Sequence, residues 1–462
     1  DGCSQLSAYE RKRLKNITEN AKFFAALKLH ESAARLHQIA TKRQSHVNRR
    51  AKPKKAEEDD KVRRRSMRLQ RVDPSGIPVP EAPAQPEAET PRPRVPDGPL
   101  PMVPEDQVEN SQLTEDLLAT WRRISEVLLV TINYFGIMQF SLRYQDSLNS
   151  MVLTEANIKK VVRYRVCSMA IHPSESIIFL AAGDTSGQVG LWNVDCQSEE
   201  GTRVFVPHNF PVRCMHFSPF SPTQLLSLSD DVLRCADVTR AVFDEVCRSE
   251  EESFSSFDFL EDGASTAVVG HWDGRVAVVD RRTPGASAEL SADIGFQRTR
   301  TVHVHPVNKQ YFIAAGSVDV CIYDVRCLKS KGNKPVSSLQ GHTKSVASAY
   351  FSPVTGSRVV TVCADDKLRI SSSEQCSIPV PLVFKKQIQT KNQNQTKTWL
   401  EQCFVVGSMA RPRQIEVFQD TGKLLHTFCN LDCLGSVCSI NTVHPSRNIL
   451  VGGNSSGRLH VF

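Results

Sequence analysis

The stretch His271-Trp-Asp-Gly-Arg-Val-Ala-Val-Val-Asp-Arg-Arg282 decides the fold. Its Asp-Gly turn is followed by alternating small, β-branched and polar residues, which predicts a short strand over 275–279. Similar segments recur along the chain, with strands ending near Trp192, Ala236, Val279, Tyr323, Ile370, Val417 and Val461. Successive ends are separated by 44, 43, 44, 47, 47 and 44 residues, so the stretch is one copy of a repeat.

A second marker has the same period. It is an apolar or aromatic residue followed by His-Pro or Ser-Pro, and it ends at Pro173, Pro219, Pro306, Pro353 and Pro445. Asp262 holds the corresponding place in the third repeat. A period of roughly 40–45 residues with four short strands per unit is typical of a β-propeller. We therefore predict an all-β, seven-bladed WD-repeat β-propeller over 151–462, with 157–163 forming the outer strand of the last blade.

The chain before the repeats is basic. Residues 1–72 carry 20 Lys and Arg against 8 Asp and Glu, a net charge of +12, whereas the whole chain carries +7. We expect a helical docking segment over 1–48, a basic and proline-rich disordered linker over 49–112, and a partly helical region of uncertain role over 113–150. The helical segment would dock either on the propeller or on a partner protein.

Two basic clusters in the linker are candidates for a nuclear import signal or a nucleic-acid-binding arm. They consist of Arg49, Arg50, Lys54 and Lys55, followed by Arg63, Arg64 and Arg65. A solvated tail is the alternative. The longest apolar run, 127–140, is too short and too interrupted to span a bilayer, so we expect a soluble intracellular protein with no membrane partner.

Position within a repeat determines the face of a propeller that a residue occupies. With strands named a to d in chain order, the b–c turns and the loops entering strand a form the top face, and the c–d turns lie on the bottom face. Asp280 and Arg282, and likewise Asp324 and Arg326, leave strand c in consecutive blades. Each aspartate can hold its arginine by a charge-assisted hydrogen bond. This pattern favours docking of a ubiquitin-ligase adaptor on the bottom rim, and a structural role is the alternative.

Positive residues are expected on the top face of blades four to six. Cations beside an aromatic ring suit phosphate contacts and base stacking, so these residues are candidates for DNA binding. Solvated side chains are the alternative. The candidates are Arg298, Arg300, Lys344, Lys391, Lys397, Trp399, Arg411 and Arg413.

Motifs for catalysis and metal binding are weak. The sequence Gly453-Asn-Ser-Ser-Gly457 matches a nucleophile motif, but it is followed by a predicted strand rather than a helix. The 14 cysteines include no C-x-x-C pair. We therefore expect no enzymatic activity, no cofactor or metal, and no small-molecule substrate. His342 is expected to stabilise the propeller by hydrogen bonding.

Several segments resemble the WD repeat-containing protein 76 family, which is similar to damage-specific DNA-binding protein 2. They include LSAYERKRLKNI (6–17), VRRRSMRLQRVDPSGIP (62–78), GQVGLWNVD (187–195), AVVDRRTP (277–284), FVVGSMARPR (404–413) and CSINTVHPSRNILVGGNSSGRLHVF (438–462). The chain departs from the family before Cys403, where about ten residues of the inner strand of blade six are missing.

The resemblance implies a nuclear, chromatin-associated protein that binds damaged or modified-base DNA, such as DNA with hydroxymethylcytosine, in the DNA-damage response. It also implies a substrate receptor of a cullin-4 type ubiquitin ligase, bound through damage-specific DNA-binding protein 1 at Arg282 and Arg326. The loop from Ile388 to Trp399 corresponds to a lesion-probing hairpin, and 411–413 to a turn that faces DNA. An alternative function is a scaffold for histones or other proteins without direct DNA readout.

Overall fold

The computed structural model describes Thr18 and residues 95–105, 111–132, 148–196, 201–249, 253–283, 288–365, 367–372, 382–384, 399–400 and 403–462. A compact unit runs from Pro91 to Phe462. The expected helical docking segment, the two basic clusters, Lys391 and Lys397 lie outside the described residues.

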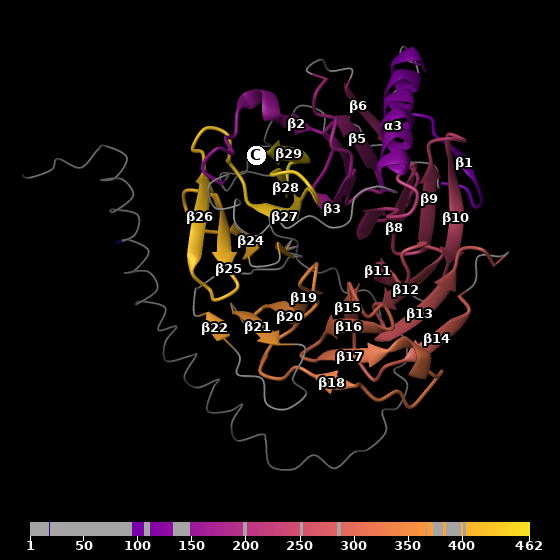
Figure 1. Ribbon diagram of the computed structural model, residues 1–462, viewed down its shortest axis with the longest axis vertical. Helices are drawn as coiled ribbons and strands as arrows, with labels where there is room; N and C mark the ends of the chain where they lie inside the picture. Colours follow the sequence, from indigo (N-terminus) through magenta and orange to yellow (C-terminus); the bar gives the residue numbers. More distant parts are fainter. Residues whose placement is uncertain are drawn as a thin grey trace, which may run out of the picture. The chain divides into compact units, whose positions relative to one another are not determined.

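Seven antiparallel sheets are arranged as blades around a ring, so the predicted seven-bladed propeller is confirmed (Figure 1). Blade one contains β3 (Val166–Ile171), β4 (Phe179–Asp184), β5 (Val189–Asn193) and β6 (Thr202–Phe205). Blade two contains β7 (Cys214–Phe217), β8 (Gln224–Leu228), β9 (Val232–Asp237) and β10 (Val242–Arg248). Blade three contains β11 (Phe254–Phe259), β12 (Thr266–His271), β13 (Arg275–Asp280) and β14 (Leu290–Asp293).

The remaining blades follow the same order. Blade four contains β15 (Thr299–Val304), β16 (Tyr311–Gly316), β17 (Val320–Asp324) and β18 (Ser337–Ser338), with a 3₁₀ turn, η4, at Val325–Cys327. Blade five contains β19 (Val346–Phe351), β20 (Arg358–Cys363), β21 (Leu368–Ser372) and β22 (Leu382–Phe384). Blade six contains β23 (Trp399–Leu400), β24 (Cys403–Ser408), β25 (Gln414–Gln419) and β26 (Leu424–Cys429). Blade seven contains β27 (Cys438–Val443), β28 (Leu450–Asn454) and β29 (Arg458–Val461).

The outer strand of blade seven comes from the other end of the propeller sequence. It is β2 (Ile158–Lys160), preceded by a 3₁₀ turn, η2 (Glu155–Asn157), and it pairs antiparallel with β29. Lys159 lies opposite Leu459 in this pairing. The predicted closure of the ring is therefore confirmed.

Blades pack face to face, so their middle strands are apolar on both sides. In β16, Phe312, Ile313, Ala314 and Ala315 are all buried. The turns between the middle strands, in contrast, depend on glycine. Gly274, in the opening Asp-Gly turn, has a φ of +96°, and a Cβ there would lie 1.8 Å from the carbonyl oxygen of Phe296. Glycine is therefore required both for the turn and for the loop that packs over it.

The expected inner strand of blade six is reduced to β23. Trp399 pairs with Phe404 and Leu400 with Cys403, so the described part of this strand is two residues long. The inner strands of the other blades have four to six residues. The shortening agrees with the missing residues inferred from the sequence.

Parts of the chain before residue 151, which were predicted to lie outside the propeller, pack against it. Within the predicted disordered linker, β1 (Leu100–Pro101) pairs with β10 as a fifth strand of blade two. The buried side chain of Arg234 fixes this segment, donating to Gly98 O at 2.6 Å and to Pro96 O at 3.0 Å. The proline-rich composition did not reveal this pairing because its partner, β10, lies far along the chain.

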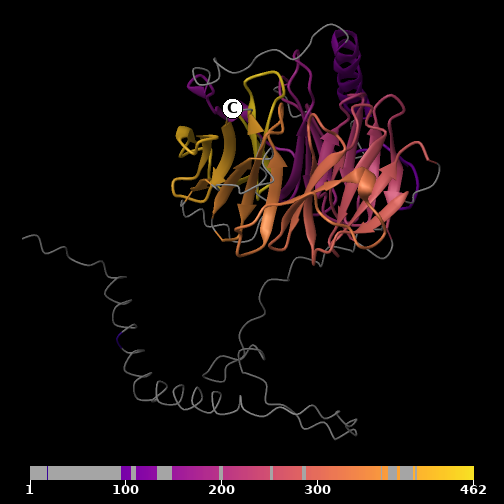
Figure 2. The same cartoon turned by 60° about the horizontal axis from the view of Figure 1, so that its bottom comes forward.

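The partly helical region contains α3 (Ser111–Ile132), which stands on the bottom face of blades one and two, the upward side in Figure 2. Trp121 is completely buried; its Nε1 donates to Pro222 O at 2.8 Å, and its ring contacts Phe179 and Phe217. Packing on the propeller therefore gives α3 a structural role. Among the described helices, none combines the length and apolar character needed to cross a membrane.

Candidate nucleic-acid interface

Trp272 contacts two arginines on the top face, in the b–c turn of blade three. The guanidinium carbons of Arg213 and Arg300 each lie 5.6 Å from the centre of its ring system. Arg213 directly precedes β7 in blade two, and Arg300 lies at a β-bulge near the start of β15 in blade four. Three neighbouring blades thus contribute to one cluster, the Arg–Trp–Arg cluster, which cation–π attraction stabilises.

The positive charge of this cluster is only partly neutralised. Arg213 donates to both carboxylate oxygens of Asp230, at 2.6 and 3.0 Å, and this hydrogen bonding raises the pKa of Arg213. Arg300 instead donates to the hydroxyl of Ser345 at 3.3 Å. Burial lowers the pKa of Arg300, and the charges of Arg298 and Arg213 lower it further. The neighbouring cations therefore repel one another.

Arg165 adds a third half-buried arginine from the loop that enters blade one. Burial lowers the pKa of Arg165, Cys167 opposes this effect, and the charge of Arg213 adds to it. The Nε atoms of Arg165 and Arg300 are buried and have no hydrogen-bond partner in the described part of the chain. Buried donors without acceptors are costly. A bound anion would reduce the repulsion among these arginines.

Two exposed aromatic rings share the top face with the cluster. Tyr164 lies in the loop between β2 and β3 and is 39% exposed, and Phe210 lies in the loop between β6 and β7 and is 47% exposed. The guanidinium carbon of Arg163 lies 5.4 Å from the ring centre of Tyr164. Arginines alternating with exposed rings are the arrangement used to hold a phosphate backbone and stack bases.

The cluster stands at a cavity of about 280 Å³ in the channel between the inner strands. Arg213 and Arg300 are part of its wall, and the other lining residues come from the inner strands of blades one to five and seven. Blade six contributes none of the described lining residues.

The predicted top-face residues fall into separate groups. Arg298, Lys344 and Arg411 are exposed in the expected loops and turns. Arg300 was expected before the inner strand of blade four, but it lies within β15, where the bulge places it in the channel wall. Arg413 donates to Met409 O within its own turn. Blade five separates Arg411 and Arg413 from the Arg–Trp–Arg cluster, and the side chain of Trp399 lies outside the described residues.

Arg165, Arg213 and Trp272 are absent from the residues predicted above. Aligning the repeats could have indicated the Arg–Trp–Arg cluster, because arginines occur near the start of the inner strand in blades two and four. They flank the blade whose b–c turn carries Trp272. Repeat position alone indicates the face of a residue but not whether its side chain turns toward the channel.

On the bottom face, Asp280 and Asp324 hold their arginines in the same way. Asp280 accepts from the backbone N–H, Nε and Nη2 of Arg282 at 2.8, 3.0 and 2.6 Å, and Asp324 accepts from the same atoms of Arg326 at 2.9, 3.0 and 2.6 Å. Hydrogen bonds from Arg282 lower the pKa of Asp280 to about 2, and those from Arg326 also lower the pKa of Asp324. The arginine side chains remain 68% and 65% exposed. The predicted hydrogen bonding is confirmed.

Known proteins include close relatives of this chain. WD repeat-containing protein 76 of Rhinolophus ferrumequinum is 50% identical over 476 residues, covering 100% of this chain and 74% of that protein. The mouse protein of the same name (Mus musculus) is 49% identical over 476 residues, covering 100% and 75%. The chain belongs to the WD repeat-containing protein 76 family. DNA damage-binding protein CMR1 of Phaeosphaeria nodorum is 24% identical over 525 residues, covering 98% of each chain. No protein-family model matches the chain.

In this member of the WD repeat-containing protein 76 family, His342, Cys363 and Asp365 form a group of potential metal ligands within the described part of the chain. Their contacts are structural. His342 Nε2 lies 2.7 Å from the hydroxyl of Thr361, and the guanidinium of Arg369 contacts His342 and donates to Asp365 at 2.8 Å. A guanidinium among the ligand atoms repels a metal ion. The contacts agree with the expected stabilising role of His342.

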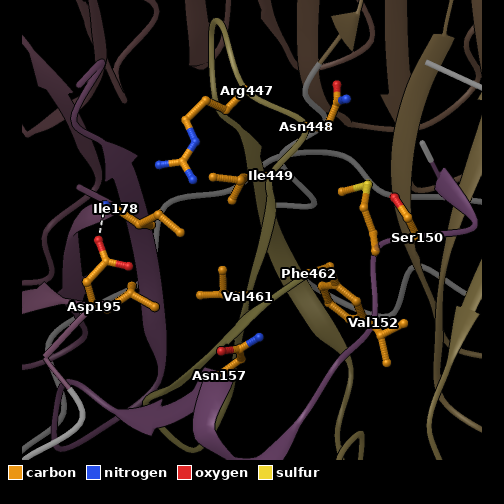
Figure 3. Close-up of a pocket in the computed structure, with 12 residues that line it drawn as sticks. Ser150, Val152, Asn157, Ile178, Asp195, Arg447, Asn448, Ile449, Val461 and Phe462 are labelled. Carbon is orange, nitrogen blue, oxygen red and sulfur yellow. Dashed lines mark hydrogen bonds between the residues drawn. The ribbon is translucent and has the colours of Figure 1, made fainter. Parts of the chain in front are cut away.

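A second cavity of this family member, of about 420 Å³, opens on the bottom face between blades seven and one (Figure 3). Ile449, Val461 and Phe462 face the hollow, and the wall also contains polar residues such as Ser150 and Asn157, with the charged residues Arg447 and Asp195 at its edge. The predicted site residues lie elsewhere, so this cavity is separate from both candidate surfaces.

Proposed function

We propose that this protein binds duplex DNA through the top face of its propeller. The observation that carries this proposal is the Arg–Trp–Arg cluster with Arg165, where three guanidiniums gather on the top face and repel one another. Arginine binds phosphate oxygens with two parallel hydrogen bonds, so a DNA backbone is a suitable partner for this group of arginines. The name of the relative DNA damage-binding protein CMR1 supports DNA as the ligand class.

Phosphate contacts should dominate the affinity. The described elements of the top face are turns and loops, whereas reading the major groove requires a helix or a two-stranded ribbon. Contacts to the backbone position a protein on DNA but carry little sequence information. We therefore propose weak sequence preference and strong dependence on salt.

The salt dependence is a direct test. If Arg165, Arg213 and Arg300 neutralise three phosphates, the logarithm of the binding constant should fall with the logarithm of salt concentration with a slope of about −3. Fluorescence anisotropy on a labelled duplex would measure it for the full chain and for a shortened protein starting at Pro91, where the compact unit begins. Binding by the full chain but not by the shortened protein would assign DNA contact to the N-terminal basic clusters and contradict the proposal.

We propose that the same surface distinguishes damaged or modified bases, including hydroxymethylcytosine. Bases in damaged DNA leave the stack at lower cost, and Tyr164 and Phe210 provide exposed rings on which such bases can stack. Competition among unmodified, hydroxymethylated and ultraviolet-irradiated duplexes tests this step. Equal affinity for all three would contradict it without affecting the proposal of phosphate binding.

We further propose that the bottom rim binds damage-specific DNA-binding protein 1, so that the protein serves as a substrate receptor of a cullin-4 type ligase. Support comes from Arg282 and Arg326, which are held rigid and largely exposed in consecutive blades. Rigid arginines lose little entropy on binding and are frequent in the centres of interfaces. The basic clusters at 49–65 are the proposed nuclear import signal.

The double variant Arg282→Gln/Arg326→Gln should abolish co-purification with that adaptor. Central interface arginines each contribute about 2 kcal/mol or more, so both together correspond to roughly a thousandfold loss of affinity. Arg240→Gln is the matched control, because Arg240 lies in the c–d turn of blade two, is 56% exposed and is paired with Asp244. Retention of adaptor binding by the double variant would contradict the proposed docking site.

A further inference from the structure

Two cysteines line the cavity beneath the Arg–Trp–Arg cluster. Cys167 belongs to β3 and Cys214 to β7, and both are half-buried. Their surroundings differ in one respect. Cys214 Sγ lies 3.3 Å from Nε2 of His216, whereas the polar contact of Cys167 Sγ is the carbonyl oxygen of Arg165, at 3.7 Å.

The pairing of Cys214 with His216 follows from strand geometry. Residues two apart in a strand lie on the same side of the sheet, so both side chains face the channel. The ring of His216 is held edge-on against Phe257, with centroids 5.2 Å apart. The other polar neighbour of the thiol, Phe257 O, is farther away, at 3.6 Å. The imidazole is therefore the nearer acceptor for the thiol proton.

The charged and titratable groups around the pair favour the protonated form of His216. Burial alone lowers the pKa of His216, but Cys214 and Asp258 outweigh this effect and raise the pKa to about 9. Across the channel, burial lowers the pKa of His303 and raises the pKa of Tyr350, so both are neutral near pH 7. Arg213 supplies positive charge in the wall of the cavity.

We propose that Cys214 and His216 form a thiolate–imidazolium pair, and that Cys214 is a site of modification by peroxides and other small electrophiles that enter the channel. A thiolate is the reactive form of cysteine, and an adjacent imidazolium stabilises it. With hydrogen peroxide, an S–O bond forms and the O–O bond breaks. The departing hydroxide takes the imidazolium proton and leaves as water, and the cysteine is oxidised to sulfenic acid.

Cys167 provides an internal control in the same cavity. Burial raises the pKa of its thiol, an effect that the charge of Arg165 only partly offsets. Reagents that reach Cys214 also reach Cys167 in the wall of the same channel. The two thiols are therefore comparably accessible, but only Cys214 has an imidazole as its partner. Cys327 and Cys429 are exposed and serve as controls for unhindered access.

Alkylation of the full chain by iodoacetamide, quantified for each cysteine by peptide mass spectrometry, tests the proposal. Between pH 8 and pH 6, the rate at an ordinary exposed thiol falls nearly a hundredfold, because its thiolate fraction falls. We expect the rate at Cys214 to fall less than about tenfold, and Cys167 to react most slowly. A rate at Cys214 that follows the pH dependence of Cys327 would overturn the proposal.

Two variants distinguish the effect of the Cys214–His216 pair on reactivity from the effect of the cavity around it. His216→Gln keeps a hydrogen-bonding side chain but cannot form an imidazolium, so Cys214 should acquire the pH dependence of Cys327. Cys214→Ser should remove the sulfenic acid that dimedone traps after treatment with hydrogen peroxide. Fast alkylation of Cys214 at pH 6 in His216→Gln would show that the imidazole is not the cause and would contradict the proposal.

Discussion

Arg213→Gln combined with Arg300→Gln should weaken duplex binding by about a hundredfold or more at low salt. Each hydrogen bond to a charged group contributes about 1.5–3 kcal/mol, so two lost contacts amount to about 3–6 kcal/mol. The slope of the salt dependence should also fall by about two, since two phosphates are no longer neutralised. Glutamine is preferable to glutamate here, because a negative charge at 213 would face Asp230. Anisotropy titrations across salt concentrations measure both quantities.

The bottom-face variant Arg282→Gln/Arg326→Gln is the matched control for this experiment. It removes the same net charge, but on the opposite face of the propeller. A strand of six residues at about 3.3 Å each is about 20 Å long, so the two faces are separated by about that distance. That distance is more than two Debye lengths at physiological salt, so the DNA affinity measured at that salt concentration should change little. Equal losses in the two double variants would mean that net charge alone drives binding, and they would exclude the top-face site.

Trp121→Ala should lower the free energy of unfolding by about 3–5 kcal/mol. The indole is fully buried between α3 and blades one and two, where it contacts Phe179 and Phe217. Its removal leaves a large cavity and deprives Pro222 O of its hydrogen bond. Urea denaturation followed by intrinsic fluorescence and circular dichroism would give the change in midpoint.

Val127→Ala is the control on the same helix. Val127 is 59% exposed, so its truncation should change stability by less than about 0.5 kcal/mol. If Trp121→Ala has an equally small effect, α3 does not pack on the propeller as described. A large effect confirms that residues before 151 stabilise the propeller, and that versions of the protein starting at 151 lack part of its core.

Repetition explains what could be predicted from the sequence. The blade number, the closing strand at 158–160 and the pairing of Asp280 with Arg282 all follow from local patterns that recur at a fixed interval. A repeat tests each assignment several times, so an error in one blade does not change the count. The positions of β1 and α3 do not recur, and their partners, Phe243 and Pro222, lie more than 100 residues away.

The Arg–Trp–Arg cluster could not be predicted for a different reason. Its members come from blades two, three and four, and the sequence order gives their face but not the direction of each side chain. The bulge at Arg300 turns this residue into the channel wall, and the position of a bulge depends on pairing with β16. Arg411, which was predicted from charge alone, is exposed but belongs to blade six, outside the three blades that form the cluster.

The pairing of β2 with β29 also determines when the ring can close during synthesis. Lys160 precedes its partner Arg458 by 298 residues. At a ribosomal rate of about 5–20 residues per second, the nascent chain carries an unpaired β2 for about 15–60 s. Throughout that interval the propeller is an open arc with exposed strand edges, on which chaperones and other nascent chains can act. Substitutions in this single pair should therefore affect the yield of closed rings more than the folding of any one blade.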